Sequence, residues 1–374
     1  MAKKIVVLGT RGIPDVLGGV ETHCEELYPR LIGLGYDVTV LARKPYLKSK
    51  KEFYYKGIKV IPLFSPKNKA FEAITHSMLG VIKARLIGCD ILHIHAVGPA
   101  LVAPFARLLG LKVVMTNHGP DYDRQKWGRL AKIMLRLGER FGTKSSNEVI
   151  VISEVINDIL KGKYNRNDAN LIYNGINIPE KAQSKDYLDE LEISEGNYLI
   201  AVGRFVEEKG FHDLIDAYIK IKNPKCRLVL VGDADHESGY SLKIKELAEK
   251  HNIVLTGFIK GEKLNQIFSH AKGFVMPSYH EGLPIALLEA MSYNLNVVVS
   301  DIPANLEVNL KKEKYFTVGN ISELSYKIGE MMLSEEFSIG YDLEKYNWDE
   351  IATQVAEVYQ KVSGHIPIKI ELNE

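Results

Sequence analysis

Residues 273–300 read GFVMPSYHEGLPIALLEAMSYNLNVVVS, and they contain two short apolar runs, Gly273 to Met276 and Asn296 to Val299, separated by a helical pattern. The loop SYHEGLP ends at Pro284, whose fixed φ suits the first turn of a helix. In the following IALLEAMS, apolar residues recur at helical spacing, so one helix face can pack on a sheet. The stretch therefore predicts a strand, a loop, a helix and a second strand, which is the repeating unit of a parallel α/β sheet.

The loop before this helix predicts a binding site for an anion, because a glycine-containing loop at a helix start directs backbone N–H groups and the positive helix end at one place. Two acids flank it, Glu281 before the helix and Glu289 inside it. Since a carboxylate does not bind an anion, these acids favour the hydroxyl groups of a sugar or a ribose as their ligand. The alternative is an ordinary acid at a helix start and a solvated helical glutamate.

The two glutamates stand in the context S-x-x-E-G-x-P-x-x-x-x-E-A, which resembles the signature of the retaining GT-B glycosyltransferases of family 4. Enzymes of that family transfer a sugar from a nucleotide diphosphate donor. The resemblance implies that Glu281 contacts the donor sugar and that Glu289 binds the ribose. It also implies that the donor lies against Gly282, Leu283 and Pro284, with its diphosphate on the N–H groups that follow Gly282.

The composition is that of a soluble globular protein, with 46% apolar and 25% charged residues in a chain of 374. The formal net charge of +1 gives no field that would attract nucleic acid, so nucleic acid is not a predicted partner. Cys24, Cys89 and Cys226 form no C-x-x-C pair, which indicates a reduced cytoplasmic protein without a zinc site. The most apolar long window, 96–115, is too interrupted by prolines and charges for a membrane span, and the N-terminal apolar run is too short for a signal peptide.

Short apolar runs and amphipathic stretches alternate along the whole chain, which predicts parallel sheets with helices on both faces. The predicted strands are 5–9, 38–42, 59–63, 91–96, 112–116, 148–153 and 170–173 in the first half, and 198–203, 227–232, 253–257, 273–277, 296–300 and 314–318 in the second half. A polar, turn-rich segment, 174–197, separates the two halves.

The order of elements and the resemblance together predict a GT-B fold, in which two doubly wound Rossmann-like domains face each other across a cleft. The predicted N-terminal domain, on the acceptor side, covers 1–178, and the predicted nucleotide-sugar-binding domain covers 179–345. The tail 346–374 contains an amphipathic helix similar to the terminal helix of the family, which returns to the first domain. A helix that stays on the second domain is the alternative.

Gly18 and Gly19 follow the first predicted strand and begin a helix, where glycine lets backbone N–H groups approach a phosphate. A dinucleotide-binding fold would have G-x-G-x-x-G here and an acid after the second strand, whereas this chain has GTRGIPDVLGG and Arg43. A dehydrogenase is therefore not favoured. By resemblance, GGVE is the first-domain glycine loop of the family, which lies near the donor phosphates.

Arg204 and Lys209 lie in VGRFVEEKGF, directly after the first strand of the second half. Ligands bind at the carboxyl ends of strands in open α/β sheets, and two cations there can neutralise a diphosphate leaving group without a metal. The pattern G-R-x-x-x-x-K-G matches the family at both basic positions, and the alternative is a solvated charged loop. The same hypothesis places the nucleotide base near the turn at Phe258 and Ile259.

His118 lies in MTNHGPD at the end of a predicted strand, where the family carries a histidine that contacts the donor sugar and the reacting centre. Without the resemblance, a structural role would be the more common one for a lone histidine. His93 and His95 alternate in ILHIHAVG and are predicted to line the floor of the cleft. A metal at this pair lacks a third predicted ligand.

Two triplets, 121–123 and 233–235, match the D-x-D metal motif of another glycosyltransferase fold, but a chain of this size yields such triplets by chance. The sequence therefore predicts no catalytic metal and no cofactor. It also shows no Ser-His-Asp set, no reactive cysteine pattern and no obvious carboxylate pair for double displacement. Retention without a protein nucleophile, as the resemblance implies, requires attack on the front face of the sugar, with the leaving phosphate taking the proton of the acceptor.

These features predict a retaining, metal-independent glycosyltransferase that uses a nucleotide diphosphate sugar. The opening GTRGIPDVLGGVET looks most like enzymes that build bacterial surface polysaccharides, some of them linked to rhamnose. A UDP-sugar is the favoured donor, and a glycan or a lipid-diphosphate-linked sugar is the predicted acceptor. Two alternatives on the same fold stay open: a non-catalytic nucleotide-sugar-binding protein, and an epimerase that releases nucleotide from its own donor without any acceptor.

Residues 124–144 read RQKWGRLAKIMLRLGERFGTK, with seven basic residues and one acid. At helical spacing Arg129, Lys132, Arg136 and Arg140 line one face, and Leu130, Ile133, Met134 and Leu137 line another, with Trp127 at the edge. This pattern predicts peripheral, salt-sensitive attachment to the anionic cytoplasmic face of the membrane. The alternative is a domain helix whose apolar face packs on the sheet and whose basic face is solvated.

Overall fold

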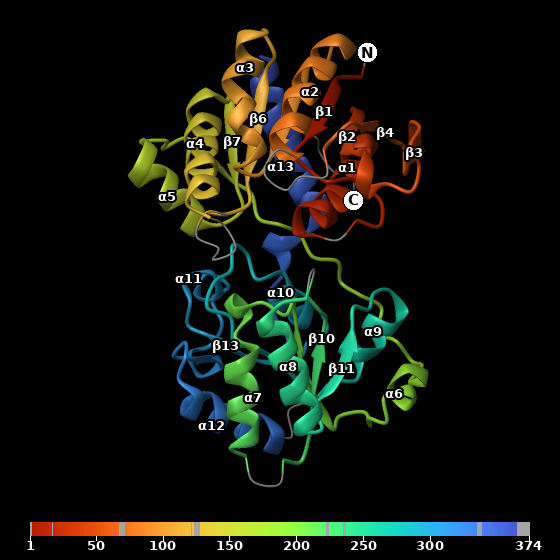
Figure 1. The fold of residues 1–374 in the computed structure, drawn as a ribbon, viewed down its shortest axis with the longest axis vertical. Coiled ribbons are helices and arrows are strands. Elements are labelled where there is room, and N and C mark those ends of the chain that lie inside the picture. Colours follow the sequence, from red (N-terminus) through yellow and green to blue (C-terminus); the bar gives the residue numbers. More distant parts are fainter. Residues whose placement is uncertain are drawn as a thin grey trace. The chain divides into compact units, whose positions relative to one another are not determined.

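The computed structural model describes residues 2–16, 18–66, 72–120, 122, 128–221, 224–234, 237–334 and 339–364. The chain divides into two compact units, one formed by Met1–Gly175 with Lys345–Glu374 and the other by Ile176–Glu344. These divisions lie close to the predicted domain limits at 178 and 345. In the described part of each unit, a sheet forms the centre and helices cover its faces (Figure 1).

The first unit is built on a mostly parallel sheet, whose described strands follow the order β3-β4-β2-β1-β5-β6-β7-β8. These strands are β1 Lys4–Leu8, β2 Asp37–Arg43, β3 Phe53–Tyr55, β4 Ile58–Leu63, β5 Ile91–His95, β6 Val113–Asn117, β7 Glu148–Val151 and β8 Asn170–Leu171. The helices are α1 Gly19–Gly33, α2 Glu72–Ile87, α3 Ala103–Leu108, α4 Arg129–Ser145, α5 Glu154–Tyr164 and α13 Trp348–Ser363.

Alternate residues of the central strand β1 fill two cores, one on each face of the first sheet. Ile5 and Val7 pack in the core that contains α1 and α13, whereas Val6 and Leu8 pack in the core that contains α2 and α3. A strand that is buried on both faces has to be apolar throughout, so the run at 5–9 could be identified from sequence as a central strand.

Helix α13 belongs to the first unit although it comes at the end of the chain. Its Trp348, Val355 and Tyr359 are buried in the same core as Tyr28 of α1. The Tyr36 hydroxyl also donates to the carbonyl oxygen of Ala356 at 3.2 Å. The predicted return of the terminal helix to the first domain is therefore confirmed.

The second unit contains a parallel sheet, whose described strands follow the order β11-β10-β9-β12-β13-β14. These strands are β9 Tyr198–Val202, β10 Arg227–Val231, β11 Val254–Gly257, β12 Gly273–Met276, β13 Asn296–Ser300 and β14 Tyr315–Phe316. The helices are α6 Asp186–Glu190, α7 Phe211–Ile219, α8 Gly239–Lys250, α9 Glu262–Ser269, α10 Ile285–Ser292, α11 Pro303–Leu306 and α12 Ile321–Leu333.

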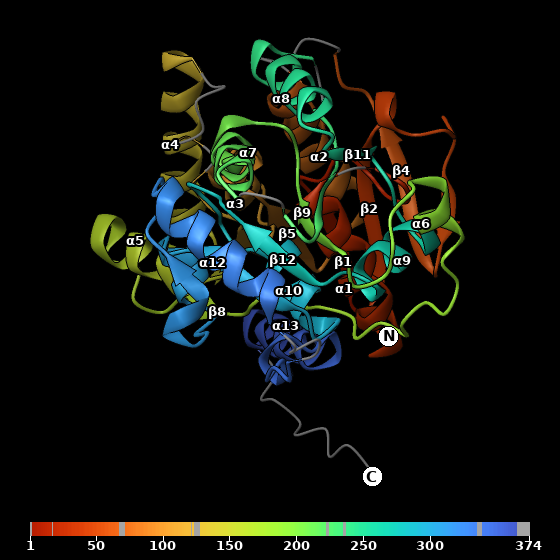
Figure 2. The same cartoon turned by 90° about the horizontal axis from the view of Figure 1, so that it is seen from below.

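Helices cover both faces of the second sheet. Residues of α7, α8 and α12 share a core with Val275 of β12, and the three helices can be followed in Figure 2. On the opposite face Phe268 of α9 stacks on Phe274, the residue before Val275, with ring centroids 6.4 Å apart. The described part of the chain thus confirms two Rossmann-like α/β domains.

The strand order reverses at one place in each sheet, and this determines where a ligand can bind. From β1 the chain adds β2 and β4 on one side before it returns to place β5 on the other side, and from β9 it adds β10 and β11 before it places β12 on the other side. Crossover connections leave a crevice at the carboxyl ends of the strands at such a switch point, where ligands bind in folds of this kind.

The structure differs from the sequence prediction in two local features. Strand β3 was not predicted; it pairs antiparallel with β4 through a turn in which Lys56 (φ 45°) and Gly57 (φ 81°) both lie in the left-handed region. Two such residues in succession are typical of a tight hairpin turn. Pro284 is the N-cap of α10 instead of its first helical residue, and the helix begins at Ile285.

Candidate functional site

In the second unit, the loops that follow β9 and β12 lie side by side, because these strands are parallel neighbours. The backbone N–H of Tyr279 donates to the carbonyl oxygen of Glu208 at 2.8 Å. Gly210 has a φ of 66° and lies so close to Pro277 that an added Cβ would be 2.2 Å from the carbonyl oxygen of the proline. Only glycine fits there, so the two loops are fixed against each other.

Lys209 and Glu281 form an ion pair across these two loops. The Lys209 Nζ donates to Glu281 Oε1 at 2.6 Å, and the Ser278 hydroxyl donates to the same oxygen at 2.7 Å. The methylene groups of Lys209 pass over Gly203, where an added Cβ would be 3.3 Å from Cδ. Lys209 was predicted to bind the donor diphosphate and Glu281 the donor sugar, and the structure shows that the two side chains contact each other. Their opposite charges are therefore already positioned at one place in the second unit.

Glu289 lies in α10, on the helix that starts from the Glu281 loop. Its side chain is half-buried, and burial raises the pKa of its carboxyl to about 7. Among the described residues no hydrogen bond or ion pair to this carboxyl is present. A partly buried carboxylate without a donor is unfavourable, so the site is suited to a ligand that brings hydroxyl donors.

The other predicted residues of the second unit also lie at the carboxyl ends of its strands. Arg204 is half-buried and follows β9. Phe258 and Ile259 follow β11, and Phe258 is 55% exposed, so its ring can contact a flat ligand. The turn into α10 is formed by Gly282, Leu283 and Pro284.

The glycine loop of the first unit contains a carboxylate that the sequence analysis missed. Gly18 is the N-cap of α1, with a φ of 146°, and Gly19 is its first residue. Glu21 Oε1 accepts the backbone N–H of Arg11 at 2.8 Å, while Oε2 lies 2.0 Å from where a Cβ on Gly18 would stand. Acids are common in the first turn of a helix, and that signal was present in GGVE. The Arg11 guanidinium forms an ion pair with Glu21 at 3.3 Å, so the carboxylate beside Gly18 is compensated by a positive charge.

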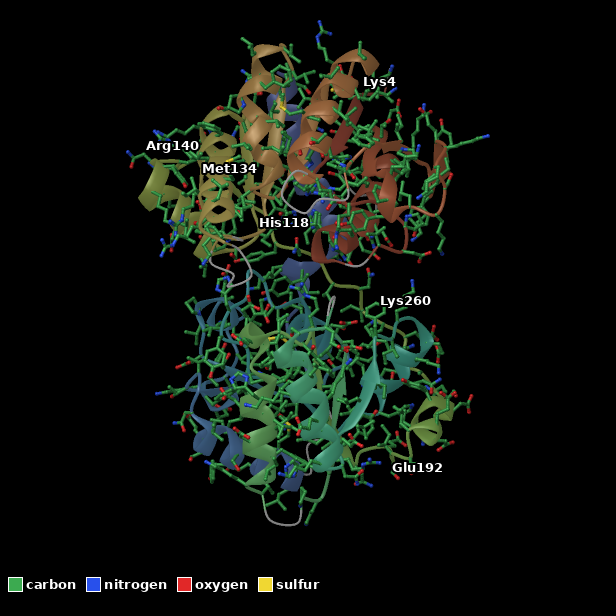
Figure 3. All side chains as sticks on the ribbon, viewed as in Figure 1. Lys4, His118, Met134, Arg140, Glu192 and Lys260 are labelled. Atoms are coloured by element: carbon green, nitrogen blue, oxygen red, sulfur yellow. The ribbon has the colours of Figure 1, made fainter. Side chains whose placement is uncertain are left out.

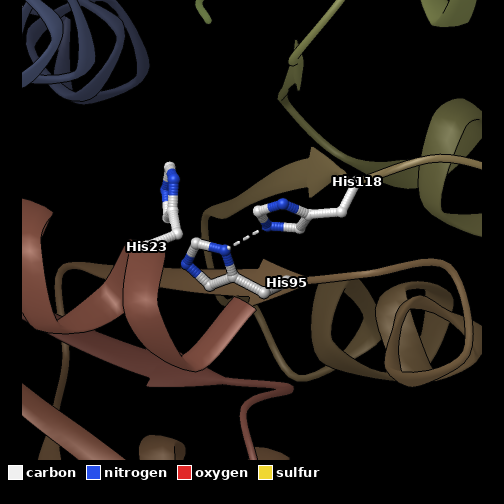
Figure 4. A group of neighbouring side chains, drawn as sticks. All are labelled: His23, His95 and His118. Atoms are coloured by element: carbon white, nitrogen blue, oxygen red, sulfur yellow. Dashed lines mark hydrogen bonds between the residues drawn. The ribbon is translucent and has the colours of Figure 1, made fainter. Parts of the chain in front are cut away.

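His23, His93, His95 and His118 gather near the carboxyl ends of β5 and β6. His93 and His95 belong to β5, His118 directly follows β6, and His23 projects from the beginning of α1. Nδ1 of His95 and Nε2 of His118 share a hydrogen bond of 2.9 Å (Figure 4). His23 was not predicted, although it lies among the buried residues of α1 and a polar residue on a buried stripe is a usable signal.

Buried hydroxyl groups connect these rings to the core. The Tyr28 hydroxyl lies 2.5 Å from Nε2 of His95 and 3.1 Å from Nδ1 of His93. His93 also contacts the hydroxyls of Tyr359 at 2.6 Å and Thr116 at 2.7 Å. Both His93 and His95 are 0% exposed. The prediction that they line the floor of a cleft is therefore wrong, because the two rings stack on each other in the core and hydrogen-bond to buried hydroxyls and, for His95, to His118.

Burial lowers the pKa of all these histidines. The pKa of His23 falls to about 4 and that of His93 to about 3, while those of His95 and His118 lie well below the usual value. Loss of hydration is the main cause, and for His93, His95 and His118 the neighbouring imidazoles add to it. Each ring is therefore neutral at pH 7, with one N–H donor and one lone pair.

The D-x-D triplets contribute nothing to the described geometry of the site. Asp233 pairs with Lys245 at 2.9 Å, and that hydrogen bond lowers the pKa of the aspartate. Asp121, Asp123 and Asp235 lie outside the described residues.

Helix α4 packs on the first sheet through glycine and leaves apolar side chains exposed. A Cβ on Gly138 would be 2.1 Å from the carbonyl oxygen of Val97, and one on Gly142 would be 2.3 Å from the sulfur of Met115. The helix axis is therefore close to the sheet on that side, and larger side chains have to lie elsewhere.

The exposed side of α4 combines apolar and basic residues. Leu130 is 74% exposed and Ile133 is 53% exposed, and Arg129, Arg136 and Arg140 are exposed as well. Met134 and Arg140 are labelled on this helix in Figure 3. The alternative in which the whole apolar face packs on the sheet is thus wrong for Leu130 and Ile133. Trp127 lies outside the described residues.

Two Rossmann-like domains, each with polar residues at the switch point of its sheet, are the architecture of the GT-B fold. Residues 17–179 match the family described as Glycosyltransferase Family 4, and residues 183–339 match the family described as Glycosyl transferases group 1. The chain belongs to these glycosyltransferases.

Known proteins of this class resemble the chain over most of its length. An uncharacterized glycosyltransferase of Methanocaldococcus jannaschii is 24% identical over 96% of this chain and 98% of its own. The putative teichuronic acid biosynthesis glycosyltransferase TuaC of Bacillus subtilis is 26% identical over 75% of this chain and 76% of its own. The structure of Anabaena HepE in complex with UDP and glucose is 19% identical, with a TM-score of 0.72 over 96% of this chain and 95% of that one.

Within the described residues, no helix is both long enough and apolar enough to cross a lipid bilayer.

Proposed function

We propose that this protein is a retaining, metal-independent glycosyltransferase that moves a sugar from a nucleotide diphosphate donor, with a UDP-sugar favoured, to a glycan or a lipid-linked acceptor. Glu289 carries the proposal. It is a half-buried carboxyl with a pKa of about 7, and no partner for it is present in the described residues. Two ribose hydroxyls would supply the missing donors, and charge-assisted hydrogen bonds of this kind are stronger than neutral ones.

The ion pair of Lys209 and Glu281 supports a donor site next to Glu289. In this proposal the donor diphosphate accepts from Lys209 and Arg204, and the hydroxyls of the donor sugar donate to Glu281. The backbone N–H groups after Gly282 add positive partial charge at the start of α10. Binding therefore replaces the contact between Lys209 and Glu281 with one contact to the ligand for each partner.

The proposed reaction needs no nucleophile from the protein. The bond from the anomeric carbon to the phosphate oxygen breaks, and the acceptor oxygen forms its bond to that carbon on the same face. The acceptor proton passes to the departing phosphate oxygen, so the products are the glycoside and the nucleotide diphosphate. Neutral His118 accepts or donates a hydrogen bond to the sugar, and Arg204 and Lys209 stabilise the charge that develops on the leaving group.

The choice of donor and acceptor class is supported by relatives. HepE was solved with UDP and glucose, and TuaC is described as a teichuronic acid biosynthesis enzyme. A uridine nucleotide and a surface polysaccharide are therefore the first donor and product classes to test. Thermal-shift measurements with UDP, GDP and dTDP separate the bases, and the proposal expects the largest stabilisation from UDP.

The decisive test of the activity is nucleotide release from a donor panel with and without acceptors. A transferase releases nucleotide only when an acceptor is present and produces a longer glycan. Release without an acceptor would indicate an epimerase or a hydrolase, and binding without release would indicate a nucleotide-sugar-binding protein. Either result would reject the proposed transfer.

We further propose that α4 attaches the enzyme to an anionic membrane surface on the cytoplasmic side. Leu130 and Ile133 can enter the interfacial region, while exposed basic residues contribute about 1 kcal/mol each near anionic lipid. Sedimentation with anionic vesicles at low salt tests this, comparing the wild type with a variant in which Arg129, Lys132, Arg136 and Arg140 are changed to Glu. A second variant changes Lys243 and Lys250 of α8 to Glu, which controls for a change in charge half as large at another exposed helix. Wild type in the supernatant, or equal pelleting of all proteins, would reject the attachment.

A further inference from the structure

His23, His95 and His118 place three imidazole nitrogens around one point. Each of the three rings offers one ligand atom, and these atoms all lie within 4.8 Å of one another. The residues come from three separate elements, namely α1, the end of β5 and the segment after β6 (Figure 4). A cluster assembled from such distant positions is a property of the fold and could not be seen as a sequence motif.

The hydrogen bonds around the cluster select which nitrogens face its centre. The amide oxygen of Asn174 can only accept, so His23 donates to it from Nδ1, at 2.7 Å, and keeps the lone pair on Nε2. Nε2 of His95 contacts the Tyr28 hydroxyl, which leaves Nδ1 toward His118. An outer partner that fixes the tautomer and orientation of a histidine is typical of metal-ligating rings.

The spacing is close to that of a tetrahedral zinc site. Zinc–nitrogen bonds of about 2.0–2.1 Å place neighbouring ligand nitrogens about 3.3 Å apart. Nδ1 of His95 and Nε2 of His118 are 2.9 Å apart, so this pair has to open by a few tenths of an ångström, while the ligand nitrogen of His23, which lies within 4.8 Å of the other two ligand atoms, has to move inward. We propose that His23, His95 and His118 bind Zn²⁺, with the fourth coordination position open to water or an anion.

Zinc binding needs no change in the number of protons on the protein. In the metal-free hydrogen bond, one of the two facing nitrogens of His95 and His118 carries the shared proton. Coordination moves this proton to the other nitrogen of the same ring. For His95 that nitrogen is Nε2, which lies beside the Tyr28 hydroxyl oxygen, and this oxygen can accept the proton in a hydrogen bond.

The ligand chemistry selects zinc over the metals usual in sugar-nucleotide enzymes. Mg²⁺ and Mn²⁺ prefer carboxylate and other oxygen ligands, whereas neutral imidazole suits Zn²⁺, Co²⁺, Ni²⁺ and Cu²⁺. The metal would bind Nε2 of His118 and place a double positive charge on the ring that the proposed function assigns to the donor sugar. Zinc is therefore an inhibitor of transfer, and this consequence rests on the proposed function, whereas the binding itself does not.

Tag-free, EDTA-treated protein titrated with Co²⁺ tests the binding. The wild type is expected to bind one equivalent with the intense visible absorption of a tetrahedral site, and one equivalent of Zn²⁺ is expected to displace it. His23→Ala should weaken Zn²⁺ binding in calorimetry at least 100-fold, and Asn174→Ala should weaken it about 10- to 100-fold. His251→Ala, a histidine outside the cluster, is the matched control and should bind like the wild type.

Absence of a tetrahedral Co²⁺ spectrum in the wild type would overturn the site, as would equal Zn²⁺ affinity of His23→Ala and His251→Ala. Circular dichroism of each variant verifies the fold.

Turnover of the EDTA-treated wild type under increasing Zn²⁺ is the second readout, and half-inhibition is expected at the Zn²⁺ concentration that half-fills the site. If zinc fills the site and turnover is unchanged, inhibition through His118 is refuted while the binding stands. If the metal-free enzyme shows no turnover, the proposed function fails while the binding result stands.

Discussion

Replacing Glu289 by glutamine should make the second unit more stable at alkaline pH and weaken donor binding at the same time. Burial raises the pKa of this carboxyl from 4.5 to about 7. A raised carboxyl pKa means that the ionised form is disfavoured in the folded state, so stability is lost as pH rises from 4.5 through 7. At about 1.4 kcal/mol per pH unit, the loss reaches about 3 kcal/mol above pH 7.

Glutamine has nearly the same shape and no charge, so Glu289→Gln avoids this loss. For a unit of this size, about 3 kcal/mol corresponds to a rise in Tm of roughly 6–12 °C at pH 8. The rise should shrink as pH falls toward 4.5. Differential scanning calorimetry at pH 5 and pH 8 measures it, and Glu246→Gln on α8 is the control for a change at an exposed glutamate.

Donor binding should change in the opposite direction. Loss of a charge-assisted hydrogen bond to ribose costs about 1.5–3 kcal/mol, or roughly 10- to 100-fold in Kd for UDP-glucose at pH 8. An equal Tm at pH 8 for Glu289→Gln and Glu246→Gln would show that the Glu289 charge does not destabilise the fold. A stabilised variant that binds UDP-glucose as tightly as the wild type would show that Glu289 does not bind the ribose.

The other predictions concern the same residues and the packing of α4. Since Glu289 must ionise to bind ribose, UDP-glucose binding at pH 6 should release about 0.9 of a proton. Calorimetry in buffers of different ionisation enthalpy measures this release. Binding without proton release would contradict the ribose contact. Lys209→Ala should lower kcat about 10²–10³-fold, whereas the control Lys243→Ala on α8 should leave kcat unchanged. Full activity of Lys209→Ala would show that Lys209 has no role in the mechanism. Gly138→Ala places a Cβ 2.1 Å from a backbone oxygen and should destabilise the first unit by about 1–3 kcal/mol. Gly162→Ala, where the helix is open to solvent, should be neutral or stabilising in the same urea unfolding series.

Regular structure was predictable from sequence because each central strand is buried on both faces and is therefore apolar throughout. The segments 5–9 and 273–277 are examples, since both contain strands at the centre of their sheets. The edge strand β3 was missed because FYY is only partly buried and has no such pattern. Its turn at Lys56 and Gly57 was the available signal.

The candidate site was predictable as a set of residues, but its contacts were not. The motif identified Lys209 and Glu281 separately, and their direct pairing depends on the close approach of Gly210 to Pro277, which is a feature of tertiary packing. Similarly, no pattern in the sequence connects His23 with His95, because these residues are 72 positions apart. Only the packing of α1 against the carboxyl end of β5 brings them together.

Proton NMR of the product shows whether the enzyme transfers the sugar with retention and without a metal. EDTA-treated enzyme is incubated with the preferred nucleotide sugar and an acceptor from the release assay, and the anomeric signal of the new glycoside is recorded before equilibration. We expect a product with the same anomeric configuration as the donor, formed at an undiminished rate when Mg²⁺ and Mn²⁺ are absent. An inverted product, or transfer that requires either metal, would refute the proposed mechanism.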